Sequence, residues 1–386
     1  MIRTASALLT IILAVSSHSE DTLFSDEPSL KSPFALEYIE IIDRLSDQQG
    51  AFYEGLHDPL IRLGNLQLEE GYPLEALKTF KRARHISKIN HGIHSFSQAE
   101  SMRGILQVLL LTGESELYEI LKLHLDSLYQ TTLQNPKVAD LPALVSGSEW
   151  HLNKYKNDLL QFSSDDLVDS VKLSKAALTL LTEQFGPSDQ RLEKPLRLLM
   201  ECQYYLAKHQ QTRVSYTSGR FQAGTQSSIK RHYQQGLEAA RRLVALFKAT
   251  GEPRAIALAL LDLGDYMQVF SQHVNAHKVY SEAWQLLSSN GEYELLAESF
   301  SKPVLLPEFD EDLYSGIPKA LAKVRLDIDG SGKTSNIKVV ETFPAANRQV
   351  ANLAKELADN SVFRPLFADG EAVSVQQHEF NVLFPN

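Results

Sequence analysis

The chain has almost no cysteine. Cys202 is the single one among 386 residues, so no disulfide can form within the chain and the fold must be held by packing alone. Cys202 lies in an apolar helical stretch from 198 to 206. Because free cysteines are buried more often than they are reactive, we interpret it as a small core residue.

Long apolar runs and an excess of positive charge are also missing. No segment reaches the roughly 18 apolar residues that a membrane-spanning helix needs, and the formal net charge is -10. Nucleic acids and anionic membrane surfaces bind proteins through basic faces, so neither is expected as a partner. With 43% hydrophobic and 22% charged residues, the composition is that of a soluble globular protein with room for two or more cores.

Motifs for catalysis, cofactors and metals are absent as well. The chain has no Gly-x-Ser-x-Gly elbow, no His-Glu-x-x-His and no dinucleotide fingerprint. Asp327, Asp329, Ser331 and Gly332 resemble the start of a calcium loop, but Lys338 stands where that loop needs glutamate. His273 and His277 lie one helical turn apart without a third ligand nearby. We therefore expect no enzyme activity, no cofactor and no metal site, and an envelope hydrolase is left as an alternative.

The N-terminus has the features of an export signal. Arg3 precedes an apolar run from Ala5 to Val15, and small residues follow it. A basic start, about eleven apolar residues and a small-residue exit are typical of a secretory signal peptide. We predict a signal peptide over residues 1–19, cleaved between Ser16 and Glu20, and hence an exported protein without a membrane span. The alternatives are a buried first helix and an uncleaved helix kept as an anchor.

Two stretches share one pattern of large and small residues. The first comprises Leu60, Leu63, Gly64, Ala76, Phe80 and Ala83, and the second comprises Leu260, Leu263, Gly264, Ala276, Tyr280 and Ala283. This spacing resembles the signature of the tetratricopeptide repeat, a pair of antiparallel helices. The glycine and the first alanine let two backbones approach closely, so that larger side chains interlock around them. Because one such pair cannot bury both of its faces, the pattern predicts a stack.

The surrounding sequence predicts further helices. Pro33 opens a helix that Gly50 ends, so residues 20–50 are expected to form an N-terminal segment with a capping helix. About five helix pairs, forming a helical solenoid, are then expected over residues 51–298. A polar stretch from Gln210 to Ser228 is interpreted as an inserted loop. The predicted fold class is mainly α, with a small α+β domain after the solenoid.

The first helix of each pair lines the concave surface of a solenoid, where peptides or partner helices bind. The polar residues expected to face this groove include Asp58, Asn65, Arg103, Gln107, Glu149, Lys194, Arg197, Glu201, Asp265 and Gln268. The apolar ones are Ile61, Leu68, Leu258 and Leu261. The family's carboxylate clamp pairs a lysine with an asparagine, and Ile61 stands where Asn65 would need that lysine. A mixed groove for a protein or peptide partner is therefore predicted, and the alternative is a solvated face without a partner.

The composition changes after residue 298. Prolines interrupt helix formation across residues 299–322, which we interpret as a linker. Residues 323–386 are expected to form an α+β domain, because apolar and polar residues alternate from Lys323 and a hairpin turn follows at Asp329 to Gly332. A helix over 346–359 and a last strand over 372–384 complete it. The apolar positions of that strand change parity near Gln376 to His378, which predicts a bulge.

This order of elements resembles the C-terminal domain of TonB, the periplasmic energy transducer of Gram-negative bacteria. The match comprises the strand, turn and strand from Val324 to Val340, Pro344 before the helix, Phe363-Arg364-Pro365 after it, Gly370 and the closing strand. The resemblance implies that the domain binds an outer-membrane transporter, whose strand adds to the edge of the sheet. We place this edge near Val373 to Leu383, with Val375 and Gln377 as candidate contacts.

These features together predict a periplasmic scaffold or adaptor for protein partners, associated with a TonB-type energy-transduction and outer-membrane transport system. The alternative is a TonB-like transducer component that an uncleaved N-terminal helix retains at the inner membrane. TonB has a long proline-rich spacer that this chain lacks, so the chain is not expected to transmit force itself.

Overall fold

The structure, a computed structural model, describes residues 32–157, 164–216, 222–307 and 320–384. The chain divides into two compact units between Ala143 and Leu144, and each unit is described by itself. The predicted signal peptide lies outside the described residues, so it stays a prediction. Within the described ranges, no helix is both long enough and apolar enough to cross a membrane.

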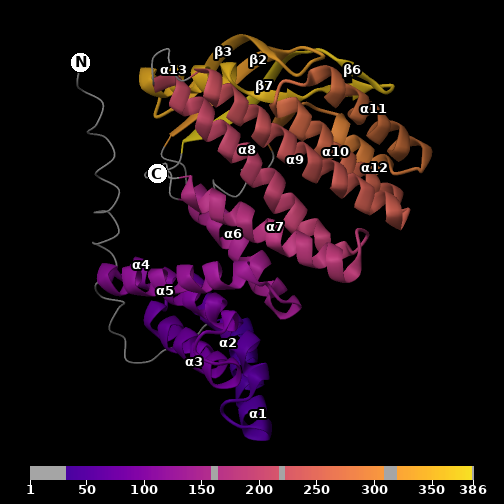
Figure 1. Cartoon of the computed structure of the whole chain (residues 1–386). Helices are drawn as coiled ribbons and strands as arrows, with labels where there is room; N and C mark the ends of the chain where they lie inside the picture. Colours follow the sequence, from indigo (N-terminus) through magenta and orange to yellow (C-terminus); the bar gives the residue numbers. More distant parts are fainter. Residues whose placement is uncertain (1–31, 158–163, 217–221, 308–319, 385–386) are drawn as a thin grey trace. The chain divides into compact units, whose positions relative to one another are not determined.

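The first unit is a series of antiparallel helices (Figure 1). It contains α1 (Pro33–Gln49), the pair α2 (His57–Glu69) and α3 (Pro73–His91), and the pair α4 (Ala99–Thr112) and α5 (Ser115–Gln134). Short 3-10 turns at Glu54–Leu56 and Phe96–Gln98 lead into α2 and α4. Ser32 caps α1 by accepting a hydrogen bond from the Phe34 N–H at 3.2 Å, and Gly50 ends it with a φ of 96°. The helix predicted between Pro33 and Gly50 is confirmed.

The small residues of the repeat pattern allow the close packing that was predicted. Phe80 of α3 is completely buried. Its ring lies so close to Gly64 of α2 and Gly104 of α4 that an added Cβ would be 2.5 Å and 2.6 Å, respectively, from a ring atom. One aromatic ring therefore packs against the first helix of its own pair and the first helix of the next pair. This is the stacking contact that a tetratricopeptide array requires.

The helices of the second unit, to which all but the first three residues of α6 belong, are paired as well. They are α6 (Leu141–Asn157) with α7 (Asp165–Phe185), α8 (Glu193–Tyr216) with α9 (Gln222–Thr250), α10 (Pro253–Val269) with α11 (His273–Ser289), and the short α12 (Tyr293–Phe300). Figure 1 shows α8, α9, α10 and α11 side by side. A Cβ added to Gly264 would overlap the buried ring of Tyr280, as at Gly64 and Phe80. The part of the chain that the structure describes thus contains five helix pairs, as expected.

The inserted loop predicted between Gln210 and Ser228 is wrong. Helix α8 continues to Tyr216 and α9 already begins at Gln222, so most of this polar stretch is helical. Glutamine and arginine have good helix propensity, and a polar composition alone therefore does not indicate a loop.

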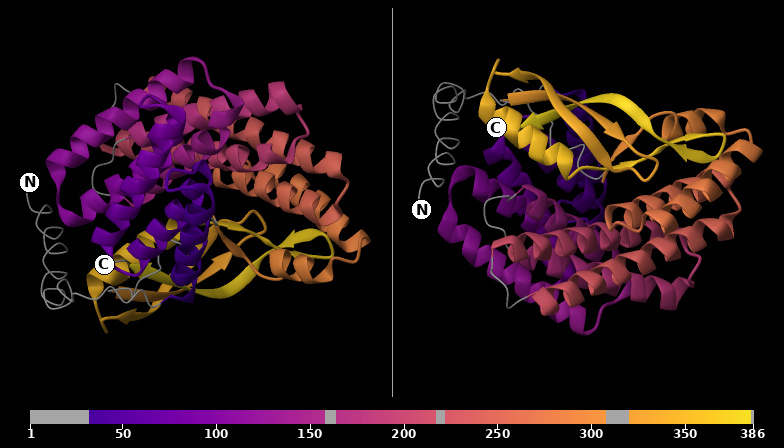
Figure 2. Two further views of the ribbon diagram at one scale, coloured as in Figure 1. Left: turned by 90° about the horizontal axis from the view of Figure 1, so that it is seen from below. Right: turned by 90° about the horizontal axis from the view of Figure 1, so that it is seen from above.

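The C-terminal strands form one three-stranded and two two-stranded sheets. In the largest, β2 (Ala320–Ile328) pairs antiparallel with β3 (Thr334–Phe343) on one side and with β7 (Val375–Phe384) on the other. Helix α13 (Arg348–Asp359) lies against one face of this sheet (Figure 2). Every second residue of β2 is buried in the core with α13: Ala322, Val324, Leu326 and Ile328. The predicted alternation is confirmed.

The predicted hairpin turn and bulge are both present. The Asp329 carboxylate accepts hydrogen bonds from the N–H groups of Ser331 at 2.8 Å and Lys333 at 3.1 Å, which holds the turn. Between β2 and β7, Leu326 pairs with His378 whereas Ile328 pairs with Val375, so β7 has one extra residue. Gln377 lies in this bulge with a φ of 54°, and its N–H donates to Asp327 Oδ1 at 2.8 Å.

The stretch interpreted as a linker contributes a strand. β1 (Val304–Leu306) pairs with β4 (Val362–Arg364), and β5 (Leu366–Ala368) pairs with β6 (Glu371–Val373). A strand of three residues is too short to show an alternating pattern, which is why the linker interpretation is wrong for residues 304–306. The strands of this C-terminal module, residues 304–306 and 320–384, belong to the same compact unit as α7 to α12.

Candidate functional site

Charged side chains connect α8 and α10, the first helices of the last two pairs. Arg197 and Glu201 are four residues apart on α8, and Asp262 and Asp265 are three apart on α10, so each pair lies on one side of its helix. Arg197 joins the two helices, because its guanidinium donates hydrogen bonds to Asp262 and, at 3.0 Å, to Glu193.

A cavity of about 220 Å³ lies beside this ion pair. Its charged lining consists of Arg197, Glu201, Asp262 and Asp265, and its apolar lining consists of Met200, Tyr266, Val269 and Pro307. Arg197 and Asp265 are among the residues predicted to face the groove, and the structure brings them together here. Sequence reasoning missed Asp262, although its position one turn before Asp265 was a usable signal.

Burial and neighbouring charges set the protonation of the groups around the cavity. Burial raises the pKa of Asp262 above its ordinary value, the Arg197 guanidinium opposes this shift, and the Asp265 carboxylate adds to it. For Arg197, burial acts to lower the pKa, but Asp262 and Glu193 together outweigh burial and the pKa is raised. Arg197 is therefore a permanent cation, and burial makes the charge of Asp262 costly even though Arg197 is its partner.

Two predicted groove residues contact the chain's own C-terminal module. Asp265 binds the Arg364 guanidinium of β4, with Nε to Oδ1 at 2.9 Å, and it accepts a hydrogen bond from the Tyr280 hydroxyl at 2.8 Å. Gln268 is 1% exposed, and its amide donates to the backbone oxygens of Ser331 and Phe363. The prediction of an open position is wrong for Gln268, because the module covers it. Asp265 lines the cavity with its charge already paired.

Aromatic packing extends the contact between the module and the last helix pair. The Phe367 ring of β5 lies 5.3 Å from the His277 ring, 6.0 Å from the Tyr280 ring and 4.9 Å from the Phe300 ring, measured between centroids. His277 also accepts a hydrogen bond from the Ala372 N–H at 3.3 Å. Aromatic rings and a buried ion pair thus hold the module on α10, α11 and α12.

The histidine pair considered as metal ligands serves this same contact. His273 Nδ1 is 3.1 Å from Gln268 Oε1, and His277 binds the module as described. In residues 32–157, 164–216, 222–307 and 320–384, no group of three or more His, Cys, Asp or Glu side chains is arranged to hold a metal ion.

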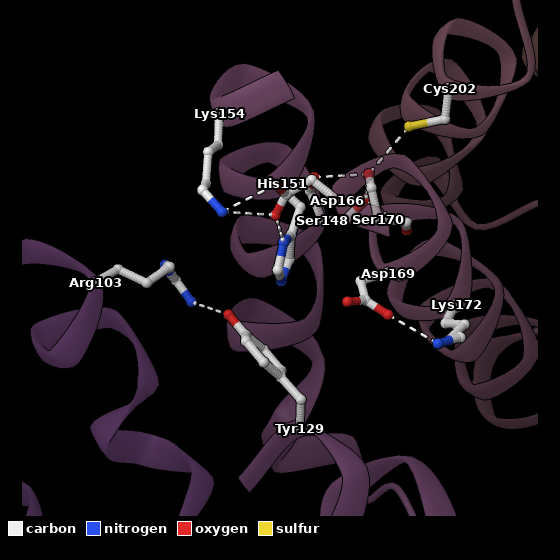
Figure 3. Close-up of polar contacts among 10 residues, drawn as sticks. All are labelled: Arg103, Tyr129, Ser148, His151, Lys154, Asp166, Asp169, Ser170, Lys172 and Cys202. Carbon is white, nitrogen blue, oxygen red and sulfur yellow. Dashed lines mark hydrogen bonds and ion pairs between the residues drawn. The ribbon is translucent and has the colours of Figure 1, made fainter. Parts of the chain in front are cut away.

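The remaining predicted groove residues differ in accessibility. Arg103 of α4 is 5% exposed and donates a hydrogen bond to the Tyr129 hydroxyl of α5 at 2.9 Å (Figure 3). The prediction that Arg103 faces an open groove is therefore wrong, because helix periodicity cannot show that the next helix covers it. The exposed residues are Asp58 and Asn65 on α2, Gln107 on α4 and Lys194 on α8. Lys194 forms an ion pair with Glu149 at 2.6 Å.

Strand β7 forms one edge of the three-stranded sheet. It pairs with β2, and no other strand of the described residues pairs with it. Val375 is half-buried at its start and Gln377 is exposed in the bulge. The predicted position of the edge is confirmed, and the two candidate contacts stay predictions.

A buried polar network joins α6, α7 and α8 (Figure 3). Ser148 Oγ lies 2.8 Å from Ser170 Oγ and 2.6 Å from Ser174 Oγ, and the Cys202 thiol donates to Ser170 Oγ at 3.0 Å. Because serine and cysteine are small, the three helices approach closely while their polar atoms stay paired. The spacing of these serines carries no recognisable motif, so sequence reasoning missed the network.

Cys202 should be unreactive in the folded chain. It is fully buried, and burial raises the pKa of its thiol from 9.0 to about 12, against the opposing hydrogen bond with Ser170. We expect no labelling by iodoacetamide at about pH 8 in the native protein and complete labelling in denaturant, measured by mass spectrometry. The unfolded thiol ionises near 9 and the folded thiol only near 12. Stability should therefore fall as pH rises above 9, by about 1.4 kcal/mol per pH unit from this group. Native labelling would contradict this assignment.

Comparisons with known proteins show distant likeness in structure alone. No family model and no curated protein matches the sequence. Two of the solved structures that resemble the chain are each 11% identical to it. One is a kinesin light chain with nearly identical TPR-like repeats from Podosopora anserina; its TM-score is 0.40, and the match covers 65% of this chain and 98% of that protein. The other is BtubC (BKLC) from P. vanneervenii; its TM-score is 0.42, and the match covers 67% of this chain and 89% of that protein. At this distance neither indicates a function, and the repeat assignment depends on the packing at Gly64 and Gly264.

Proposed function

We propose that the chain is a periplasmic scaffold that binds another protein on the surface formed by α8 and α10. The observation that carries the proposal is the cavity between these helices, with a charged and an apolar side. Stacked helix pairs present their first helices as a binding surface, and a bound segment is anchored there by side chains that enter pockets. The exposed Lys194 and half-exposed Arg197 of α8 border the same surface.

The edge of β7 supports a second binding mode. An unpaired strand edge can accept a strand from another chain through main-chain hydrogen bonds, whatever the side chains are. The resemblance to the TonB C-terminal domain suggests an outer-membrane transporter, or a component of the TonB system, as the donor of that strand. The predicted signal peptide would bring the chain to the compartment where such partners are accessible.

The same edge favours a second candidate function, in which the chain is itself a transducer component held at the inner membrane by its N-terminal helix. The two candidates differ at the N-terminus. Sequencing the mature protein should find a start near Ser17 for the exported scaffold and a start at Met1 for the anchored component.

Site-specific photo-crosslinking tests whether these surfaces bind proteins in the cell. We expect a benzoylphenylalanine at Lys194 on α8, or at Asn381 on β7, to form adducts with envelope proteins. Asn275 on α11 is the matched control, because it lies on a second helix away from the cavity and the edge. Lys194, Asn381 and Asn275 are all exposed in the structure. Adducts at Asn275 alone, or no protein adduct at any position, would contradict the proposal.

A further inference from the structure

We propose that the first unit has a further protein-binding surface, on which α3 and α5 bind a segment of a partner protein through its acidic side chains. The surface consists of a basic cluster, Arg84, Lys88, His94 and His124, and of exposed apolar residues beside it on α5. α3 and α5 are the second helices of their pairs, whereas the surface proposed above is formed by the first helices α8 and α10 of the other unit.

Helix α3 is strongly basic in a chain whose net charge is -10. It carries five lysine and arginine residues but a single acidic one, Glu75. Arg84 and Lys88 are four residues apart and therefore lie on the same side of the helix. Glu75 is nine residues before Arg84, about two and a half turns, which places it on the opposite side. The positive charge of this side is thus not neutralised within α3.

Arg84 connects α3 with α5 without meeting an acidic group. Its Nη2 lies 3.2 Å from His124 Nδ1, and its Nε donates to the buried Gln98 side-chain oxygen at 3.4 Å. A guanidinium has no lone pair to accept with, so His124 Nδ1 is the acceptor and the ring is neutral here. In the part of the chain that the structure describes, none of the cluster's four side chains forms an ion pair with a carboxylate.

The pKa values in the cluster agree with this lack of acidic partners. Burial lowers the pKa of Arg84, and burial together with the Arg84 charge lowers the pKa of Lys88. For His124, burial lowers the pKa first, and the charges of Arg84, Lys88 and His94 lower it further. No carboxylate of the described residues contributes to these three shifts. An acidic group bound here would therefore relieve the repulsion among the cations.

Exposed apolar side chains lie beside the cluster on α5. Ile120 and Leu117 are four and seven residues before His124, so they lie on the same side of the helix. They are 60% and 54% exposed, respectively. A free anion would leave both residues in water, whereas an amphipathic protein segment can cover them while its carboxylates lie on the cluster. The combination of cations and apolar groups therefore fits an acidic protein segment.

An anionic membrane fits this surface less well. Polybasic segments that bind membranes carry about four to eight lysines and arginines, whereas the cluster has only Arg84 and Lys88, both half-buried. The net charge of -10 also opposes the approach of the chain to an anionic surface. Vesicles therefore serve as a comparison in the test.

Sets of labelled peptides test the inference. Each peptide has three fixed residues one helical turn apart and randomised apolar residues between them, and binding to the full chain is measured by fluorescence anisotropy. The fixed residues are glutamate, glutamine or lysine. We expect the glutamate set to bind at least about tenfold more tightly than the glutamine set, and the lysine set to bind most weakly. Inorganic phosphate is titrated calorimetrically, and vesicles of equal parts phosphatidylglycerol and phosphatidylcholine are tested by co-sedimentation.

Paired variants locate the effect in the cluster. Arg84→Gln with Lys88→Gln removes two of its cations and should abolish the preference for glutamate. Lys78→Gln with Arg82→Gln is the matched control, because it removes the same charge from another side of α3, where Arg82 donates to Ser46 of α1 at 2.9 Å. Thermal unfolding by circular dichroism checks that each variant is folded.

A second pair covers the case in which loss of Arg84 unfolds the unit. Lys88→Gln with His94→Gln leaves the contacts of Arg84 with Gln98 and His124 intact. It should reduce the preference for glutamate at least about threefold, because one full charge of the cluster is lost.

The outcomes separate this inference from the proposed scaffold function. Equal binding of the glutamate and glutamine sets by the unmodified chain overturns the inference, as does a preference that survives in the cluster variants or disappears in the control. Binding of phosphate or vesicles that the cluster variants abolish, without binding of the glutamate set, overturns the protein segment as the source. Binding of no probe overturns the inference outright. The crosslinks expected at Lys194 and Asn381 are measured separately and stand or fall without it.

Discussion

Replacing Arg364 by methionine should destabilise the second unit by about 3–5 kcal/mol, because it leaves a buried carboxylate without its cation. Arg364 is 4% exposed and Asp265 is largely buried with it. The guanidinium also donates to the Ser299 carbonyl oxygen at 3.3 Å, so its loss affects α12 as well. The module that rests on α10 and α11 should therefore separate at a lower denaturant concentration.

The measurement uses Trp284, whose ring lies close to Gly370 of the module. The chain has two tryptophans, so guanidinium unfolding followed by fluorescence in a Trp150→Phe background reports this contact. Arg325→Met is the matched control, since Arg325 pairs with Glu379 on the exposed face of the sheet and should change stability little. The double variant Asp265→Leu with Arg364→Met should be more stable than Arg364→Met alone. Equal effects of Arg325→Met and Arg364→Met would contradict the role of the buried pair.

Replacing Gly332 by alanine should cost about 3 kcal/mol or more, the sum of a left-handed backbone penalty and an overlap in a packed contact. Gly332 has a φ of 80°, and an added Cβ would overlap the Phe363 carbonyl oxygen and the Gln268 amide. These two groups are hydrogen-bonded to each other in the contact between α10 and the module. The substitution should therefore weaken the module's attachment as well as the turn.

Gly330 in the same turn is the control for this prediction. Its φ is not in the left-handed region, and an added Cβ would be 3.3 Å from the nearest atom, the Ala372 carbonyl oxygen. Gly330→Ala should change the free energy of unfolding by no more than about 1 kcal/mol. Both variants are compared by urea unfolding monitored through Trp284. A smaller loss for Gly332→Ala than for Gly330→Ala would show that the contact is not packed as described.

Much of the helical architecture could be predicted because its signals are local. Gly64 lies four residues after Leu60, and Gly264 lies four residues after Leu260. Each glycine faces an aromatic ring of the following helix, so a spacing along the chain corresponds to a contact in space. The bulge at Gln377 was predictable for the same reason, since a change of parity in one strand is visible in that strand. The polar stretch around Gln210 led to the wrong prediction of a loop. Polar residues indicate that a segment is exposed, but they do not tell a helix from a loop.

The site could be predicted only in part. The helix period correctly placed Arg197 and Asp265 on the sides of α8 and α10 that line the cavity. It could not show that Tyr129 covers Arg103, or that Ser331 and Phe363 cover Gln268. Arg364 appeared in the sequence as part of a short motif after a helix, without any sign that its partner lies 99 residues earlier.

The sequence alone therefore determined the stacked helix pairs, the alternation of the sheet, the turn and the bulge, because each depends on residues a few positions apart. Only the tertiary structure decided that the C-terminal module packs on the last helix pair, which predicted groove residues it covers, and where a cavity is left. Those properties depend on contacts between residues far apart in the chain, and no period or local motif encodes such contacts.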